Sequence, residues 1–187
     1  MTRGIIIFGP TGAGKTTLGK LVAQKLEYPY YDIDDYIWRK DTEIPFTVMY
    51  TRKEKADRLM EAISRHEHFV MAGSMSSFHA AFDPLFDLAV YLTADTDVRA
   101  ARVHERELAM FGSRALPGGD MFEAHQRFLR ECASYDKDDY DPRTRQQHLE
   151  WVSTLPCKVL HLNGEDDLTK NAQTIISSYS ACIRKQM

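Results

Sequence analysis

Residues 9–16, with the sequence GPTGAGKT, constrain this chain more than any other stretch. They follow the apolar run IIIF at residues 5–8, which is short, β-branched and typical of a strand buried on both faces. Glycines let successive backbone N–H groups turn inward into an anion-binding nest, where a Cβ atom would clash. A helix that begins at Lys15 directs its positive N-terminal end at the same anion. The stretch therefore predicts a phosphate-binding loop between a buried strand and a helix.

The same residues match the Walker A pattern, Gly-x-x-x-x-Gly-Lys-Thr, in which each fixed residue has a chemical role. The lysine supplies a mobile charge that reaches the β- and γ-phosphates, and the threonine hydroxyl binds Mg²⁺. We therefore predict ATP and Mg²⁺ as cofactors. The residues expected to contact the nucleotide in this stretch are Gly9, Pro10, Thr11, Gly12, Ala13, Gly14, Lys15, Thr16 and Thr17.

Strand and helix patterns alternate along the chain, which predicts a parallel sheet covered by helices on both faces. The strand patterns lie at residues 4–8, 28–34, 68–74, 86–94 and 157–164, and helical patterns at 15–26, 51–65, from 95 onward and 167–185. At 187 residues the chain is long enough for one domain with a full core and short for two. We expect a single domain with its core in residues 1–34, 68–94 and 157–187.

Two intervals are too long to be simple connections between strands. Residues 35–67 combine an aromatic-rich stretch with a helical pattern, and we expect a substrate-binding insertion there. Residues 95–156 contain a glycine-bearing loop, a helical pattern at 121–134 and an acidic run at 135–143. Because this second interval carries its own helical periodicity, we expect an ordered lid.

Charge, hydropathy and cysteine content narrow the class of protein. The net charge of −3 gives no overall basic footprint for a nucleic acid. The apolar runs are far shorter than the roughly 18 residues of a membrane span, and the first strand pattern leaves no room for a signal peptide. The three cysteines are isolated and odd in number. We expect a reduced, cytoplasmic protein, monomeric or homodimeric, that binds neither nucleic acid nor membrane.

Acidic residues cluster in YDIDDY, residues 31–36, and not at the ends of the third and fourth strand patterns. Motors and many switch ATPases place their Mg²⁺-binding aspartate at such a strand end. Side chains at i and i+2 of a strand share a face, so Asp32 and Asp34 are expected to point together toward the sheet edge where Lys15 lies. One carboxylate then serves the metal and the other the phosphate acceptor. The alternative is a solvated strand end or a helix cap.

In these motifs the chain resembles the small-molecule P-loop kinases, the group of shikimate kinase, gluconate kinase and the nucleoside monophosphate kinases. The resemblance extends over most of the chain as an order of motifs and is strongest at residues 9–17 and 32–34. It implies the P-loop NTPase fold, a three-layer α/β/α sandwich around a five-stranded parallel sheet in the order 2-3-1-4-5. It also implies that Asp32 lies near Mg²⁺, that Asp34 contacts the acceptor hydroxyl, and that Arg52 binds the acceptor.

The resemblance extends to the acceptor site and the lid. Kinases of this group carry a glycine-rich turn after the third strand, which is reduced here to Gly73 and followed by Ser74. We expect both residues to bind the acceptor, and the reduced turn argues against shikimate itself. The lid arginines of the group correspond loosely to Arg102, Arg106 and Arg114, with Arg102 assigned to the nucleotide and Arg114 to the acceptor.

Arg99, Arg102 and Arg106 recur at helical spacing and are expected to share one face of a helix. Arginines delivered by a closing lid stabilise the negative charge that phosphoryl transfer spreads over the equatorial oxygens. Ion pairs on the surface with Glu105 and Glu107 are the alternative.

The leading prediction is an ATP- and Mg²⁺-dependent kinase that transfers the γ-phosphate to a hydroxyl of a small polar molecule. Its predicted catalytic residues are Lys15, Asp34 and Arg106. A hydroxyl is favoured because an acceptor phosphate next to Asp34 would meet a like charge. A nucleoside or nucleotide acceptor is the alternative within this class. A nucleotide-gated regulatory or binding protein is the alternative from another class.

Overall fold

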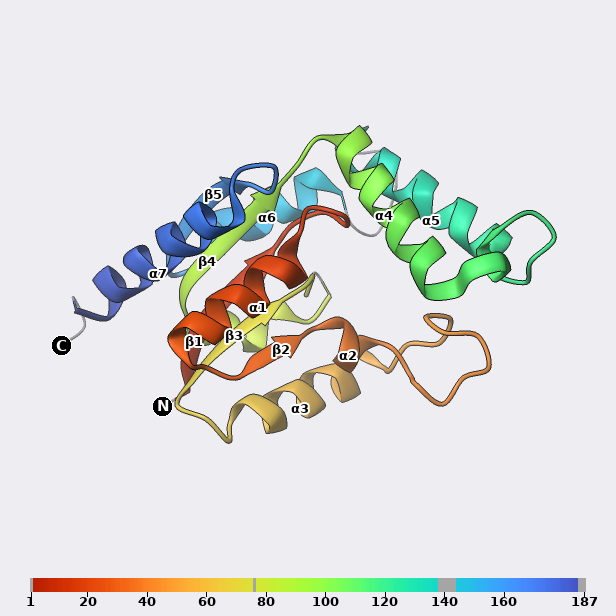
Figure 1. Ribbon diagram of the computed structural model, residues 1–187. Helices are drawn as coiled ribbons and strands as arrows, with labels where there is room; N and C mark the ends of the chain where they lie inside the picture. Colours follow the sequence, from red (N-terminus) through yellow and green to blue (C-terminus); the bar gives the residue numbers. More distant parts are fainter. Residues whose placement is uncertain (1, 76, 138–143, 185–187) are drawn as a thin grey trace.

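The computed structural model describes residues 2–75, 77–137 and 144–184. Its strands are β1 (Arg3–Phe8), β2 (Tyr30–Asp32), β3 (His68–Ala72), β4 (Phe86–Thr93) and β5 (Lys158–Asn163) (Figure 1). Its α-helices are α1 (Lys15–Leu26), α2 (Asp34–Ile37), α3 (Arg52–Ile63), α4 (Thr96–Phe111), α5 (Phe122–Ser134), α6 (Arg145–Thr154) and α7 (Leu168–Arg184). Short 3₁₀ helices are η1 (His79–Ala81), η2 (Asp83–Leu85), η3 (Gly112–Ala115) and η4 (Tyr135–Lys137).

The five strands form one parallel sheet in the order β2-β3-β1-β4-β5. β1 lies at the centre, and its residues 5–8 have no exposed surface. Such a strand must be apolar on both faces, which explains the continuous run of isoleucines. The sheet confirms the predicted fold class and strand order.

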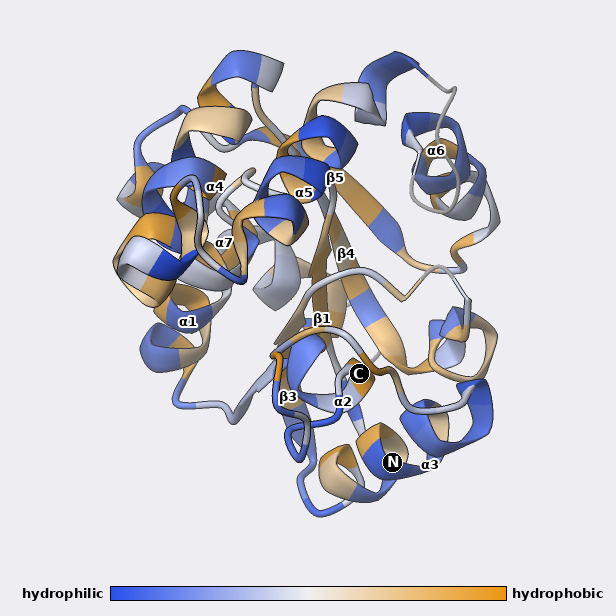
Figure 2. Cartoon of the chain, turned by 90° about the vertical axis from the view of Figure 1, so that its right-hand side faces the viewer, coloured by the Kyte–Doolittle hydropathy of each residue, from blue (hydrophilic) through white to orange (hydrophobic). Residues whose placement is uncertain are grey.

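Helices cover both faces of the sheet and give two separate hydrophobic clusters. Ile5 and Ile7 of β1 pack with α1 and α7, whereas Ile6 and Phe8 pack on the opposite face with α3 and α6. Hydrophobic residues colour the strands in Figure 2, while the helices carry hydrophilic residues on their outer sides. In the described part of the chain, no helix is both long and apolar enough to cross a membrane.

The expected helix at 51–65 is observed as α3, and its start is fixed by a capping box. The Thr51 hydroxyl accepts from the Glu54 backbone N–H, and the Glu54 carboxylate accepts from the Thr51 backbone N–H. The expected strand at 28–34 is shorter in the structure, because β2 ends at Asp32 and the chain turns directly into α2.

The interval 95–156, expected as a lid, divides into two parts with different surroundings. Helices α4 and α5 form a hairpin that extends away from the sheet (Figure 1). Helix α6 instead packs on the sheet, where Trp151 lies 4.3 Å from Phe8 between ring centroids and donates its indole N–H to Asp83. Most of the expected acidic run, residues 138–143, lies outside the described residues.

The packing of α6 predicts a large stability effect at Trp151. We expect Trp151→Ala to lower the free energy of unfolding by about 3–5 kcal/mol, because it empties a buried ring site and leaves a hydrogen bond unmade. Leu149→Ala, at an exposed position of the same helix, should change it by less than about 0.5 kcal/mol. Urea denaturation measures both. Equal effects of the two variants would mean that α6 is not part of the core.

Candidate active site

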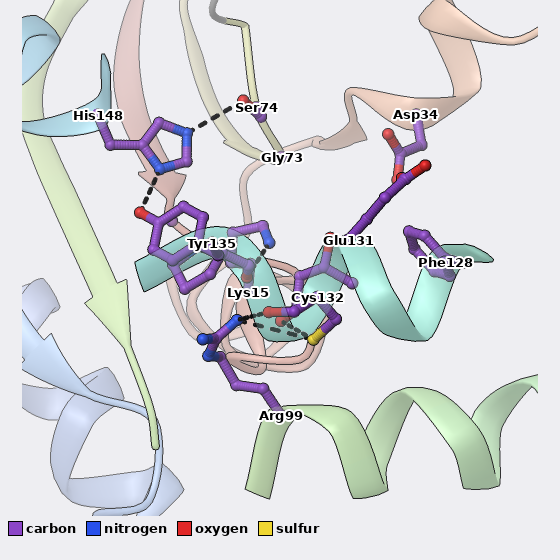
Figure 3. Close-up of a pocket in the computed structure, with 13 residues that line it drawn as sticks. Lys15, Asp34, Gly73, Ser74, Arg99, Phe128, Glu131, Cys132, Tyr135 and His148 are labelled. Atoms are coloured by element: carbon purple, nitrogen blue, oxygen red, sulfur yellow. Dashed lines mark hydrogen bonds between the residues drawn. The ribbon is translucent and has the colours of Figure 1, made fainter. Parts of the chain in front are cut away.

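A cavity of about 60 Å³ lies at the carboxyl ends of β1 and β3, between the phosphate loop (residues 9–14) and α5 (Figure 3). This edge of an open parallel sheet is where such folds bind ligands. The cavity has room for several water molecules or a group of about phosphate size. Its lining consists of Gly9, Pro10, Thr11, Lys15, Asp34, Gly73, Ser74, Arg99, Phe128, Glu131, Cys132, Tyr135 and His148.

The phosphate loop adopts a conformation that requires glycine. Gly9 and Gly12 have φ angles of 142° and 82°, and a Cβ atom at either would overlap a backbone oxygen, of Leu92 and Arg99 respectively. Gly14, at the N-cap of α1, has no side chain to cap the first-turn amides, so these amides are left for an anion. The Lys15 ammonium donates to the Pro10 carbonyl oxygen at 2.7 Å, which holds the lysine over the loop.

Thr16 and Asp32 lie side by side where α1 begins and β2 ends. The Thr16 hydroxyl donates to Asp32 Oδ2 at 3.2 Å. The Tyr30 hydroxyl donates to the same oxygen at 3.2 Å, and burial, followed by the nearby Asp32 charge, raises the pKa of Tyr30 well above its usual value. Because Tyr30 stays protonated, it holds the carboxylate toward Thr16. Two hard oxygen groups therefore meet at the mouth of the phosphate loop.

Asp34 is the first residue of α2, and it lines the same cavity as Lys15 (Figure 3). The expectation that Asp32 and Asp34 share a strand face is wrong, because β2 ends at Asp32. Asp32 Oδ1 accepts from the Asp34 backbone N–H at 3.2 Å, and this local contact starts the turn into the helix. Both carboxylates still reach the phosphate loop, since the turn lies at the carboxyl edge of the sheet.

Arg99 is the arginine of α4 that lines the cavity, and it is fully buried. Its guanidinium donates to the Ala94 carbonyl oxygen (3.0 Å), the Cys132 carbonyl oxygen (3.1 Å) and the Asp136 carboxylate (2.6 Å). It also donates to the Thr96 hydroxyl at 2.9 Å. Through these contacts Arg99 joins the start of α4 to the end of α5.

Arg102 and Arg106 are not among the residues that line the cavity. Arg102 donates to the carbonyl oxygens of Gly12 (3.4 Å) and Gly164 (3.2 Å), so it links the phosphate loop to the loop after β5. The exposed Arg106 guanidinium lies 5.9 Å from the Phe128 ring centroid. The alternative of surface ion pairs with Glu105 and Glu107 is not observed among the described residues, and Glu107 instead pairs with buried His125 at 2.6 Å.

Arg114 and Arg52 are both exposed. Arg114 lies in η3 and pairs with Asp120 at 2.7 Å, and Arg52 is the first residue of α3. Neither lines the cavity, so their predicted contacts with the acceptor stay predictions. Gly73 and Ser74 do line the cavity, and their contact with the acceptor also stays a prediction.

Five lining residues were not predicted from the sequence: Phe128, Glu131, Cys132, Tyr135 and His148. Four of them come from α5 and η4, where Phe128, Glu131, Cys132 and Tyr135 recur at the three- and four-residue spacing of one helical face. That spacing was the available signal. Burial raises the pKa of the Cys132 thiol, so this side chain is a neutral wall of the cavity.

Known proteins resemble this chain in sequence and in fold. The family model described as shikimate kinase matches residues 11–155. The uncharacterized protein YqaC of Bacillus subtilis is 30% identical over 175 residues, which are 91% of this chain and 93% of that protein. Cytidylate kinase 2 of Borreliella afzelii is 25% identical over 152 residues, 75% of this chain and 83% of that one.

Among solved structures, a gluconokinase from Sinorhizobium meliloti superposes with a TM-score of 0.56 over 98% of this chain and 95% of that chain, at 16% sequence identity. This likeness shows the fold and confirms the P-loop kinase architecture expected from the sequence. The family match covers well over half of the chain and includes most of the phosphate loop, the Asp32–Asp34 turn and the α4–α5 hairpin. The chain therefore belongs to the shikimate kinase family, and it is a small-molecule kinase whose family membership implies ATP as the phosphate donor.

Proposed function

We propose that this protein transfers the γ-phosphate of ATP, in a Mg²⁺-dependent reaction, to a hydroxyl group of a small polar metabolite. The observation that carries the proposal is the convergence of three groups at one sheet edge. Lys15 lies over the phosphate loop, Asp32 meets Thr16, and Asp34 lines the adjoining cavity. A cation at the phosphates, oxygen ligands for a metal and a carboxylate for the acceptor are what phosphoryl transfer to a hydroxyl needs.

The phosphate loop and α4 form the nucleotide side of the proposed site. The N–H groups at the start of α1, together with Lys15, would bind the phosphates, while Arg102 lies where the loop after β5 meets Gly12. The Thr16 hydroxyl and the Asp32 carboxylate suit Mg²⁺, because both present hard oxygen atoms. A bound Mg²⁺ would neutralise charge on the phosphate oxygens during transfer.

The acceptor side of the cavity favours a hydroxyl over a phosphate as the attacking group. Asp34 and Glu131 both line it, and a phosphate about 4 Å from one carboxylate would meet a repulsion of roughly 4 kcal/mol at an effective dielectric constant near 20. A hydroxyl instead donates its hydrogen bond to Asp34, which orients the attacking oxygen and accepts the proton. The similarity to a cytidylate kinase favours a nucleoside or nucleotide as the second candidate acceptor.

The α4–α5 hairpin is the proposed lid over this centre. Phe128, Glu131 and Cys132 of α5 line the cavity opposite the phosphate loop, and Cys132 Sγ lies 3.7 Å from the Thr11 carbonyl oxygen (Figure 3). This cover excludes water from the transferring phosphate. Arg106 lies next to Phe128 of this lining, and its charge acts on Cys132, so a small movement of the hairpin would bring it to the transferring phosphate.

The function is tested by ADP release from ATP and Mg²⁺ with gluconate, shikimate, cytidine, adenosine and CMP, each against a sample without acceptor. Release that depends on gluconate or shikimate supports the proposal. Release that depends on cytidine, adenosine or CMP supports the nucleoside or nucleotide alternative. Equal release in all samples contradicts kinase activity on these classes and favours a nucleotide-gated binding protein.

We predict that Asp34→Asn lowers kcat by about 10²–10⁴-fold, because the amide cannot accept the proton of the acceptor hydroxyl. The Kd of ATP should change less than about three-fold, since the proposed ATP ligands are Lys15 and the N–H groups at the start of α1, whereas Asp34 is assigned to the acceptor. Steady-state kinetics and calorimetric titration with ATP measure the two quantities. Asp35→Asn is the control, because Asp35 is exposed and pairs with Lys40. Full activity of Asp34→Asn would remove Asp34 from the mechanism.

A second prediction concerns the metal. Asp32→Asn should raise the half-saturating Mg²⁺ concentration by about ten-fold or more, because it removes the charged oxygen next to Thr16. Tyr30→Phe removes only the supporting hydrogen bond to Asp32 and should raise it by less than about three-fold. Rates measured across a Mg²⁺ titration at saturating ATP test both variants. An unchanged Mg²⁺ dependence in Asp32→Asn would place the metal elsewhere.

A further inference from the structure

A chain of four hydrogen-bonded side chains begins at the cavity lining and leads into the core, and none of its contacts is explained by the roles proposed above. Ser74 Oγ lies 3.2 Å from His148 Nε2, and His148 Nδ1 lies 2.7 Å from the Tyr135 hydroxyl (Figure 3). The Tyr135 hydroxyl lies 2.8 Å from the Tyr91 hydroxyl. The four residues come from the turn after β3 and from α6, η4 and β4, so the chain joins segments that are far apart in sequence.

The hydrogen-bond chain is buried everywhere except at its Ser74 end. His148, Tyr135 and Tyr91 are 1%, 5% and 4% exposed, whereas Ser74 is partly exposed and lines the cavity. Burial raises the pKa of both tyrosines, so each phenol keeps its proton and has one hydrogen to donate. The ring of His148 packs edge-on against Phe8, with 5.6 Å between ring centroids. The Tyr135 ring centroid lies 5.2 Å from Cζ of Arg99.

Counting the donors and acceptors gives the hydrogen-bond chain a direction. The Tyr91 hydroxyl has Tyr135 as its hydrogen-bond partner among the described residues. If Tyr135 donated to Tyr91, the Tyr91 hydrogen would be buried without an acceptor, at the full cost of its desolvation. If Tyr91 donates to Tyr135, then Tyr135 donates to His148 Nδ1, and the Nε2–H group donates to Ser74 Oγ. The Ser74 hydrogen is then the end of the hydrogen-bond chain, and because Ser74 lines the cavity, this hydrogen is available to a molecule bound there.

We infer that His148 is a positioning residue for the acceptor: held as the Nε2–H tautomer by Tyr135, it fixes the Ser74 hydroxyl as a hydrogen-bond donor to an oxygen atom of the acceptor. This inference rests on the proposed function, because it assigns Ser74 to acceptor recognition. It pairs a donor at Ser74 with an acceptor group at Asp34 across the same cavity. An oxygen-rich molecule with one hydroxyl to donate and a second oxygen to accept satisfies both.

Two histidine variants separate the two ring contacts. His148→Asn keeps a side-chain oxygen near the Nδ1 position for Tyr135 but loses the contact with Ser74, whereas His148→Gln places an amide N–H near the Nε2 position. With the compound that the acceptor panel shows to be phosphorylated, Ser74→Ala and His148→Asn should each raise the acceptor KM about three- to ten-fold. The ATP KM should stay within about two-fold, and His148→Gln should recover part of the loss. His66→Asn, at an exposed histidine outside the cavity, is the matched control.

The double variant Ser74→Ala/His148→Asn should be no worse than either single variant, because both remove one interaction. Additive losses, or an equal rise of the ATP KM, would mean that His148 acts only through the general stability of the fold and would overturn the inference.

The tautomer is measured independently of activity. Two-bond ¹H–¹⁵N spectra of the histidine rings, with His148 identified by its absence in His148→Asn, should show a protonated Nε2 and an unprotonated Nδ1. A protonated Nδ1 would overturn the inference, whatever the kinetics. If no panel compound is phosphorylated, the proposed function and the assignment of Ser74 to an acceptor both fail, while the ring spectrum still decides the direction of the chain.

Discussion

Backbone atoms packed against the phosphate loop set the geometry on which the rest of the site depends. A Cβ atom at Gly12 would meet the backbone of Arg99, and one at Gly164 would overlap the Ala13 carbonyl oxygen. The loop is thus enclosed by the first turn of α4 and by the loop after β5. Because these contacts are between backbone atoms, no change of side-chain rotamer relieves a misfit. The position of the loop therefore follows from the pairing of β1, β4 and β5 in the sheet.

Arg99 explains how the proposed lid is tied to this framework. Burying a guanidinium is costly unless its donors are satisfied, and here they reach Asp136, Thr96 and two carbonyl oxygens. The contacts join the first turn of α4 to the end of α5, next to Gly12. The base of the hairpin is therefore fixed to the phosphate loop, whereas its far end, around Arg114, makes an exposed ion pair. Movement of such a hairpin would be largest at that far end.

The parts of the molecule that the sequence predicted well are those specified by neighbouring residues. The buried strand at 5–8, the helix at 15–26 and the loop between them follow from a single continuous stretch. The convergence of Asp32 and Asp34 was predicted for the wrong reason, because a local hydrogen bond ends the strand at Asp32. Helical spacing correctly placed Arg99, Arg102 and Arg106 on one helix, but it did not predict how deeply each side chain is buried. The burial of Arg99 depends on Cys132 and Asp136, which are distant in sequence.

The nucleotide side and the acceptor side of the cavity differ in how many segments of the chain build them, and this difference affects the specificity for the acceptor. The nucleotide side is built from one short segment, so its chemistry can be predicted from the sequence. The acceptor side combines Asp34, Ser74, Glu131 and His148, which only the folded chain brings together. His148 is presented by α6, which packs through Trp151 on the face of the sheet opposite α1. Substitutions on that helix can therefore change the acceptor that fits while the phosphate loop, packed on the other cluster, keeps its shape.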